Sequence, residues 1–76
     1  MDLRQFGRRL RAARVTCGYE EAASFAADLA VDLAHYLQIE DGKREPELHF
    51  VEDVARLTGR SLDFLVLGRG PAVSRR

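Results

Sequence analysis

Two short amphipathic segments lie within residues 18–46 with only two residues between them, and this spacing constrains the fold more than any other feature. In the first segment, apolar residues recur at the i, i+3, i+4, i+7 spacing of a one-sided helix: Ala22, Phe25, Ala26 and Leu29. This predicts a helix over about residues 21–29. Asp32 is a favourable N-cap, because its carboxylate can accept unpaired backbone N–H groups, so a second helix is predicted from there to about Glu40. Residues 30–31 form the turn.

The second of these helices is expected to have two different faces. Tyr36 and Ile39 fall on the inward side, whereas the outward arc consists of Leu33, Ala34, Leu37 and Gln38. An outward arc on a short helix that follows a tight turn can contact a partner. We therefore take this arc as the candidate functional surface.

The other apolar periodicities predict three further helices and no strand. The first runs from about Asp2, its N-cap, to Thr16, with an apolar face of Leu3, Phe6, Leu10 and Ala13. The fourth covers about residues 47–58, with an apolar face of Leu48, Val51, Val54, Ala55 and Leu57. Ser61 caps a short fifth helix, whose inward residues are Leu62, Leu65 and Val66. The sequence thus predicts one all-α domain over residues 1–70 and a short basic tail over residues 71–76.

The composition places the chain among globular proteins, because 46% of its residues are apolar and 32% are charged. It contains no run of about 18 apolar residues and no charged segment before an apolar stretch. We therefore expect no membrane association and a cytoplasmic location.

Charge is distributed unevenly, although the net charge is zero. Residues 1–18 carry +4, residues 19–42 carry −6 and residues 43–76 carry +2. The predicted helix pair is thus the acidic part of the chain. Arg4, Arg8 and Arg11 share one face of the first helix, where they form either a solvated face or a nucleic-acid patch.

Four stretches distributed over the chain belong to one pattern: FGRRLRAARVTCGY, AASFAADLAV, IEDGKREP and LTGRSLDFLVLGRGP. With them the chain resembles the lambda-repressor-like (Cro and phage-repressor type) helix-turn-helix family, from Phe6 to about Gly70. The resemblance implies a compact five-helix domain in which the second and third helices form the helix-turn-helix. It also implies a dimeric transcription regulator that binds double-stranded DNA with the third helix in the major groove. We expect any homodimer to form through the fifth helix and the tail.

The resemblance assigns roles to individual residues. The base-reading positions correspond to Leu33, Ala34, Leu37 and Gln38. Only Gln38 can pair with a base edge through two hydrogen bonds, as an amide does with adenine. Lys43 and Arg44 match loop positions that approach phosphates, or are a solvated turn, and His35 on the helix flank either contacts DNA or a partner or is simply solvated. Arg14 and Glu40 match positions that form a structural ion pair.

Four positions depart from the family's pattern. Glu21 and Ala22 stand where the family commonly has Ser or Thr followed by Gln, and a carboxylate there would be repelled by phosphate. Ala30 occupies a turn position that favours glycine, and Asp41 adds negative charge to the following loop. An alternative function is therefore a helix-turn-helix domain that binds a protein partner through Leu33 and Leu37.

No catalytic or metal-binding pattern is recognised. His35 and His49 lie 14 residues apart, and Cys17 is the only cysteine, so no metal-ligand spacing is present. We expect neither an enzyme nor a cofactor.

Overall fold

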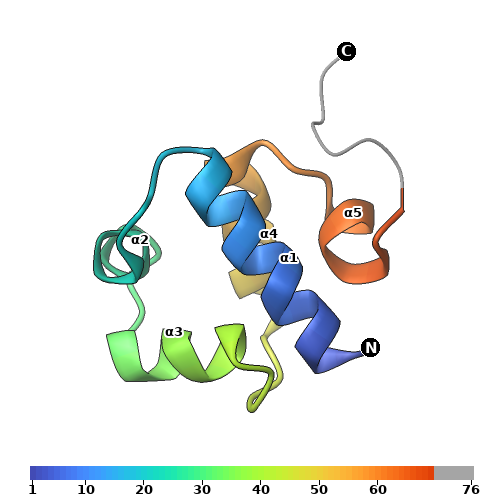
Figure 1. Cartoon of the computed structure of the whole chain (residues 1–76), viewed down its shortest axis with the longest axis horizontal. Coiled ribbons are helices and arrows are strands. Elements are labelled where there is room, and N and C mark those ends of the chain that lie inside the picture. Colours follow the sequence, from blue (N-terminus) through green and yellow to red (C-terminus); the bar gives the residue numbers. More distant parts are fainter. Residues whose placement is uncertain (70–76) are drawn as a thin grey trace.

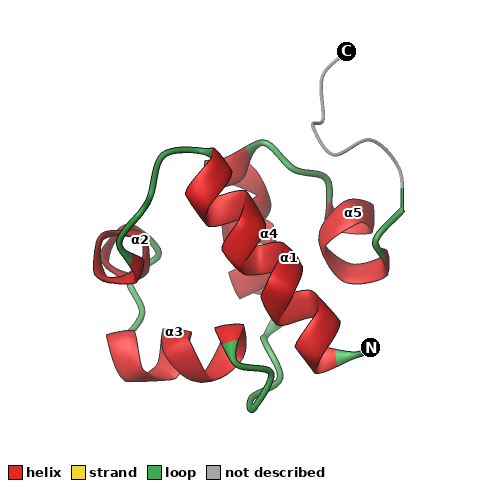
Figure 2. Cartoon of the chain, in the orientation of Figure 1, coloured by secondary structure: helices red, strands yellow, loops and turns green. Residues whose placement is uncertain are grey.

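A computed structural model describes residues 1–69, which form five helices and no strand (Figure 1, Figure 2). The helices are α1 (Leu3–Thr16), α2 (Ala22–Asp28), α3 (Leu33–Glu40), α4 (Leu48–Thr58) and α5 (Leu62–Leu67). The all-α prediction is confirmed, and each predicted boundary lies within one residue of the observed one. The tail at 71–76, and its predicted part in a homodimer, lie outside the described residues. Within the described range, no helix is long and apolar enough to cross a membrane.

Side-chain caps explain where three of the helices begin. Asp2 accepts hydrogen bonds from the backbone N–H groups of the next turn, and Asp32 and Ser61 do the same at the starts of α3 and α5. All three caps were predicted, because each satisfies backbone donors that have no partner within the helix. Glu21 and Glu47 occupy the same position in α2 and α4 without a side-chain cap.

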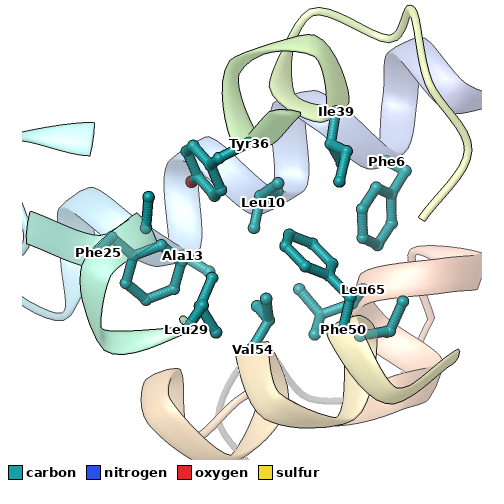
Figure 3. Packing of buried hydrophobic residues seen from close by; sticks show 12 residues of the cluster. Phe6, Leu10, Ala13, Phe25, Leu29, Tyr36, Ile39, Phe50, Val54 and Leu65 are labelled. Carbon is teal, nitrogen blue, oxygen red and sulfur yellow. The ribbon is translucent and has the colours of Figure 1, made fainter. Parts of the chain in front are cut away.

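The core lies where α1 crosses α4, and all five helices contribute to it. In Figure 1, α1 passes in front of α4, α3 lies below α1, and α2 and α5 flank the pair on opposite sides. Figure 3 shows the buried cluster, which consists of Phe6, Leu10, Ala13, Phe25, Ala26, Leu29, Tyr36, Ile39, Phe50, Val51, Val54 and Leu65. The ring of Tyr36 meets Phe25 edge-on, with centroids 5.7 Å apart. Tyr36 therefore joins α3 to α2 through the favoured arrangement of two aromatic rings.

Two residues predicted to face the core do not. Leu48 is 70% exposed and Leu62 is 40% exposed, whereas Phe50, absent from the predicted face, is 4% exposed. The face of α4 is centred on Val54, and at about 100° per residue Leu48 lies roughly 120° around the helix from it. Leu62 is the first residue of a six-residue helix, which is too short for periodicity to separate an inward position from its neighbour.

Arg9 of α1 holds α5 in place. The Nε atom of Arg9 donates to the carbonyl of Leu65 at 2.9 Å, and its Nη2 atom donates to the carbonyl of Val66 at 3.0 Å. These carbonyls lie in the last turn of α5, where they lack helical partners and favour a cation. Arg9 therefore caps a helix that begins more than 50 residues later in the chain.

The turn between α2 and α3 is strained at the position expected from the sequence. Ala30 has a φ of 60°, and it is the only non-glycine residue with positive φ in the part of the chain described. The left-handed conformation costs an alanine roughly 1 kcal/mol. The turn is closed by the N–H of Val31, which donates to the carbonyl of Ala26 at 3.0 Å.

Gly7 allows the backbones of α1 and α3 to touch. It is buried in the middle of α1, and a Cβ atom placed on it would lie 2.2 Å from the carbonyl oxygen of Glu40. Glycine inside a helix ordinarily costs about 0.5–1 kcal/mol relative to alanine. Only glycine fits at this position, because a side chain would overlap the backbone of α3.

We expect Gly7→Ala to destabilise the fold, although alanine is the better helix former. The added methyl group should force α1 away from α3 and lower the free energy of unfolding by about 1–3 kcal/mol. This loss outweighs the gain in helix propensity. Thermal melting should then fall by about 4–8 °C for each kcal/mol lost. Ala12→Gly, at an exposed position of the same helix, measures the propensity term alone. If Gly7→Ala gained as much stability as Ala12→Gly lost, the proposed packing constraint would be wrong.

Candidate nucleic-acid interface

Helix α3 presents its candidate arc at the surface. Ala34 and Gln38 are exposed, while Leu33 and Leu37 are each 40% exposed. Tyr36 and Ile39 point the other way and are at most 1% exposed. His35 is half-buried on the flank. The arrangement leaves one face of α3 open to a partner while the opposite face is fixed in the core.

A buried ionic network fixes the carboxyl end of α3 against α1. The Nε atom of Arg14 lies 2.7 Å from Oε2 of Glu40, and both side chains are less than a tenth exposed. Arg14 also donates through Nη1 to the carbonyls of Tyr19 and Glu20, at 2.8 and 2.9 Å. The hydroxyl of Tyr36 donates to the same carboxylate oxygen of Glu40. Arg14 therefore ties α3 to the segment that leads into α2 as well as to α1.

The charged and polar atoms of this network are paired with one another. Burial raises the pKa of Tyr36, and the bond to Glu40 raises it further, so the hydroxyl remains a donor. Burial by itself lowers the pKa of Arg14, but the hydrogen bond and charge of Glu40 outweigh this and the pKa is raised. Within residues 1–69, every buried side-chain nitrogen and oxygen has a hydrogen-bond partner. The resemblance supplied the ion pair, whereas the Tyr36 hydroxyl was missed because the ring was assigned only to the core.

Two of the candidate DNA-binding residues are joined by a hydrogen bond. The Nε atom of Arg44 donates to Oε1 of Gln38 at 2.8 Å, and both residues are exposed. The loop reaches this position because Gly42 has a φ of 75°, and the N–H of Lys43 then donates to the carbonyl of Gln38 at 2.9 Å. Sequence spacing alone did not indicate this pairing. The structure thus brings Gln38, Lys43 and Arg44 together at the carboxyl end of α3.

The charge around α3 differs between its two ends. Asp32 is exposed at the start of α3 and Glu21 is exposed before α2, whereas Lys43 and Arg44 follow the end of α3. Asp28 of α2 accepts a hydrogen bond from the Tyr19 hydroxyl at 2.6 Å, and this bond raises the pKa of Tyr19. Asp41 and Glu45 are also exposed and lie beside these two cations, so the loop after α3 is mixed in charge, whereas Glu21 and Asp28 give the α2 side only carboxylates.

The remaining candidate groups do not converge on a reactive site. His49 is exposed, and its Nδ1 atom lies 3.3 Å from Oε1 of Glu47. It follows His35 by 14 residues in the sequence. Cys17 is exposed at the end of α1. Across residues 1–69, no group of three or more His, Cys, Asp or Glu side chains is placed to hold a metal ion.

No family model matches the chain, and comparison with curated proteins and with solved structures also found no match.

We expect removal of either partner of the buried ion pair to be strongly destabilising. Arg14→Met leaves the Glu40 carboxylate buried without its cation, and Glu40→Gln does the converse, so each should cost about 3–5 kcal/mol. Urea or thermal unfolding measures the loss. The exposed pair of Arg56 and Asp53, at 2.9 Å, provides the control. Arg56→Gln should cost about 1 kcal/mol or less. Equal stability of Arg14→Met and Arg56→Gln would contradict a structural role for the buried pair.

Proposed function

We propose that the chain is a DNA-binding transcriptional regulator of the Cro and phage-repressor type, with a lambda-repressor-like fold. In this proposal α2, the turn and α3 form the helix-turn-helix, and α3 enters the major groove of double-stranded DNA. The pairing of Gln38 with Arg44 carries the proposal. It places an oriented amide beside a guanidinium on the open side of a helix.

The chemistry of this pair suits base recognition. Arg44 uses Nε to hold Oε1 of Gln38, which leaves the amide NH2 group and a second lone pair of Oε1 for a base edge. An amide used in this way pairs with N7 and N6 of adenine. The terminal nitrogens of Arg44 remain for a phosphate, as does the ammonium of Lys43. One guanidinium would thus position the reading side chain and hold the backbone at the same time.

The shape of α3 supports the same function. An α-helix with its side chains is about 10–12 Å in diameter, which fits the roughly 12 Å width of the major groove. Ala34 is small and exposed, so the first turn of α3 can approach the base edges closely. Leu33 and Leu37 can contact thymine methyl groups. Recognition would combine a few base contacts with the shape of the duplex.

We further propose that the regulator is cytoplasmic and acts as a homodimer. Leu62 and Leu67 of α5 are 40% and 58% exposed, and they offer an apolar surface to a second copy. Two copies would place two α3 helices on successive half-sites of the DNA.

A second candidate function is a protein-binding module. Leu33 and Leu37 lie one helical turn apart at the surface, and residues 19–42 carry a charge of −6. An exposed apolar pair in an acidic surrounding suits a partner with a basic rim around an apolar groove.

For the DNA-binding function, we expect Gln38→Ala and Lys43→Ala to have different effects. Gln38→Ala should reduce discrimination between the preferred site and random DNA, because it removes the base contact. Lys43→Ala should weaken binding to all sequences about equally and reduce the salt slope by roughly one unit. Fluorescence anisotropy on selected and random duplexes at several salt concentrations measures both. Equal loss on both duplexes for Gln38→Ala would contradict its assignment as the reading residue.

The double variant Leu33→Ser/Leu37→Ser should separate the two candidate functions. A DNA-binding surface loses only methyl contacts, so nonspecific affinity should be retained while site preference changes. A protein-binding surface loses two anchors that contribute about 1.5–3 kcal/mol each when buried, so partner capture should disappear. Pull-down and DNA titration of the same variant measure these outcomes. Circular dichroism should remain unchanged, because both side chains lie on the open face of α3.

A further inference from the structure

Three arginines of α1 have charged groups with no partner among residues 1–69. Arg4, Arg8 and Arg11 are exposed, and their side chains form no hydrogen bond or ion pair with the rest of residues 1–69. The other two arginines of this helix both hold the structure together: Arg9 caps α5, and Arg14 binds Glu40. The three unpaired cations are therefore free to bind an anionic ligand.

Their positions oppose helix stability. Arg4 and Arg8 are four residues apart, and Arg8 and Arg11 three apart, so neighbouring side chains on the helix surface repel one another. Arg4 also places a cation in the first turn of the helix, where the helix dipole favours an anion. Such a row is stabilised when a polyanion lies along it.

The row is continuous with the loop that follows α3. A Cβ atom on Gly42 would lie 2.9 Å from both Cα and Cγ of Arg4, so the loop passes directly against this arginine. Gly7 is three residues after Arg4 and four before Arg11, and it touches the carbonyl of Glu40. The row therefore borders the contact between α1 and α3, and in Figure 1 the start of α1 lies beside the loop after α3. We call the combined surface the basic stripe; it consists of Arg4, Arg8, Arg11, Lys43 and Arg44.

We propose that the basic stripe binds the sugar–phosphate backbone of duplex DNA beside the groove that α3 occupies. This inference rests on the proposed function and extends the DNA contact from the loop onto α1. Guanidinium groups donate two parallel hydrogen bonds to phosphate oxygens, so a row of them matches a row of phosphates. Arg4 and Arg11 are seven residues apart, about 10.5 Å along the helix, which is close to the roughly 10 Å rise of three base pairs.

The surface between the arginines also suits a nucleic-acid backbone. Arg8 and Arg11 line a shallow open depression of about 410 Å³ together with Ala12 and Val15. Val15 is 45% exposed, so this apolar surface is open to a ligand. A deoxyribose can rest on the apolar part while its phosphates meet the flanking guanidinium groups.

The test compares two charge-matched double variants. Arg8→Gln/Arg11→Gln removes two cations of the stripe, and Arg56→Gln/Arg69→Gln removes two exposed cations outside it. Binding to a duplex is measured between 50 and 200 mM salt. Loss of two phosphate contacts should reduce the salt slope of the first variant by about 1.8. Its affinity deficit relative to the parent should thus shrink about tenfold across this range. The second variant should retain the salt slope of the parent. Arg8→Lys/Arg11→Lys should recover most of the slope that Arg8→Gln/Arg11→Gln loses.

The outcomes distinguish this inference from the proposed function. If the parent binds duplex DNA and Lys43→Ala lowers its slope, but the two double variants behave alike, the extension of the DNA contact onto α1 is overturned and the regulator stands. If the parent shows no salt-dependent binding to duplex DNA, both proposals fail. Melting curves of each variant show whether the fold is intact, and all substituted positions are exposed.

Discussion

The contact between α1 and the last residue of α3 determines how the candidate surface is presented. Glu40 meets the backbone of α1 at Gly7 through its carbonyl, while its carboxylate accepts from Arg14 and Tyr36. Because the main chain and the side chain of one residue are both held, α3 can neither slide along α1 nor rotate about its own axis. The following loop then starts from a fixed point, and Gly42 brings it against Arg4. The orientation of Gln38, Lys43 and Arg44 is therefore a consequence of packing on the opposite side of α3.

Local signals predicted most of the fold, because helix boundaries depend on neighbouring residues. The caps Asp2, Asp32 and Ser61 satisfy backbone donors two or three residues away, so they could be recognised without tertiary information. The partners of Gly7 and Arg9 could not be recognised in this way, since they lie more than 30 residues away and no periodicity marks them. A glycine inside a strong helical pattern was nevertheless a signal of close approach between backbones. The prediction that Leu48 faces the core was wrong, because an apolar residue in the first turn of a helix need not lie on the face that packs.

The candidate site, like the fold, was predictable where it depends on neighbouring residues and not where it depends on the path of the chain. Its exposed arc on α3 followed from helical periodicity, which separates Tyr36 and Ile39 from Leu37 and Gln38. The hydrogen bond from Arg44 to Gln38 depends on the path of the loop, and that path depends on the left-handed conformation of Gly42. The distribution of charge was visible in the sequence. Its arrangement in space, with unpaired arginines adjoining the loop, required the structure.

A net charge of zero does not argue against binding to a polyanion in a molecule of this size. Its principal extents are 33 × 25 × 19 Å, whereas the Debye length at physiological salt is about 8 Å. Charges farther apart than this length are largely screened from each other, whereas Asp41 and Glu45 lie in the same loop as Lys43 and Arg44 and reduce its positive charge. A duplex approaching α2 would meet Glu21 and Asp28, and one approaching the basic stripe would meet five cations together with Asp41 and Glu45. In the proposed function, the acidic segment would then restrict the orientation of binding rather than prevent it, because only an approach from the side of the basic stripe brings a duplex to these cations.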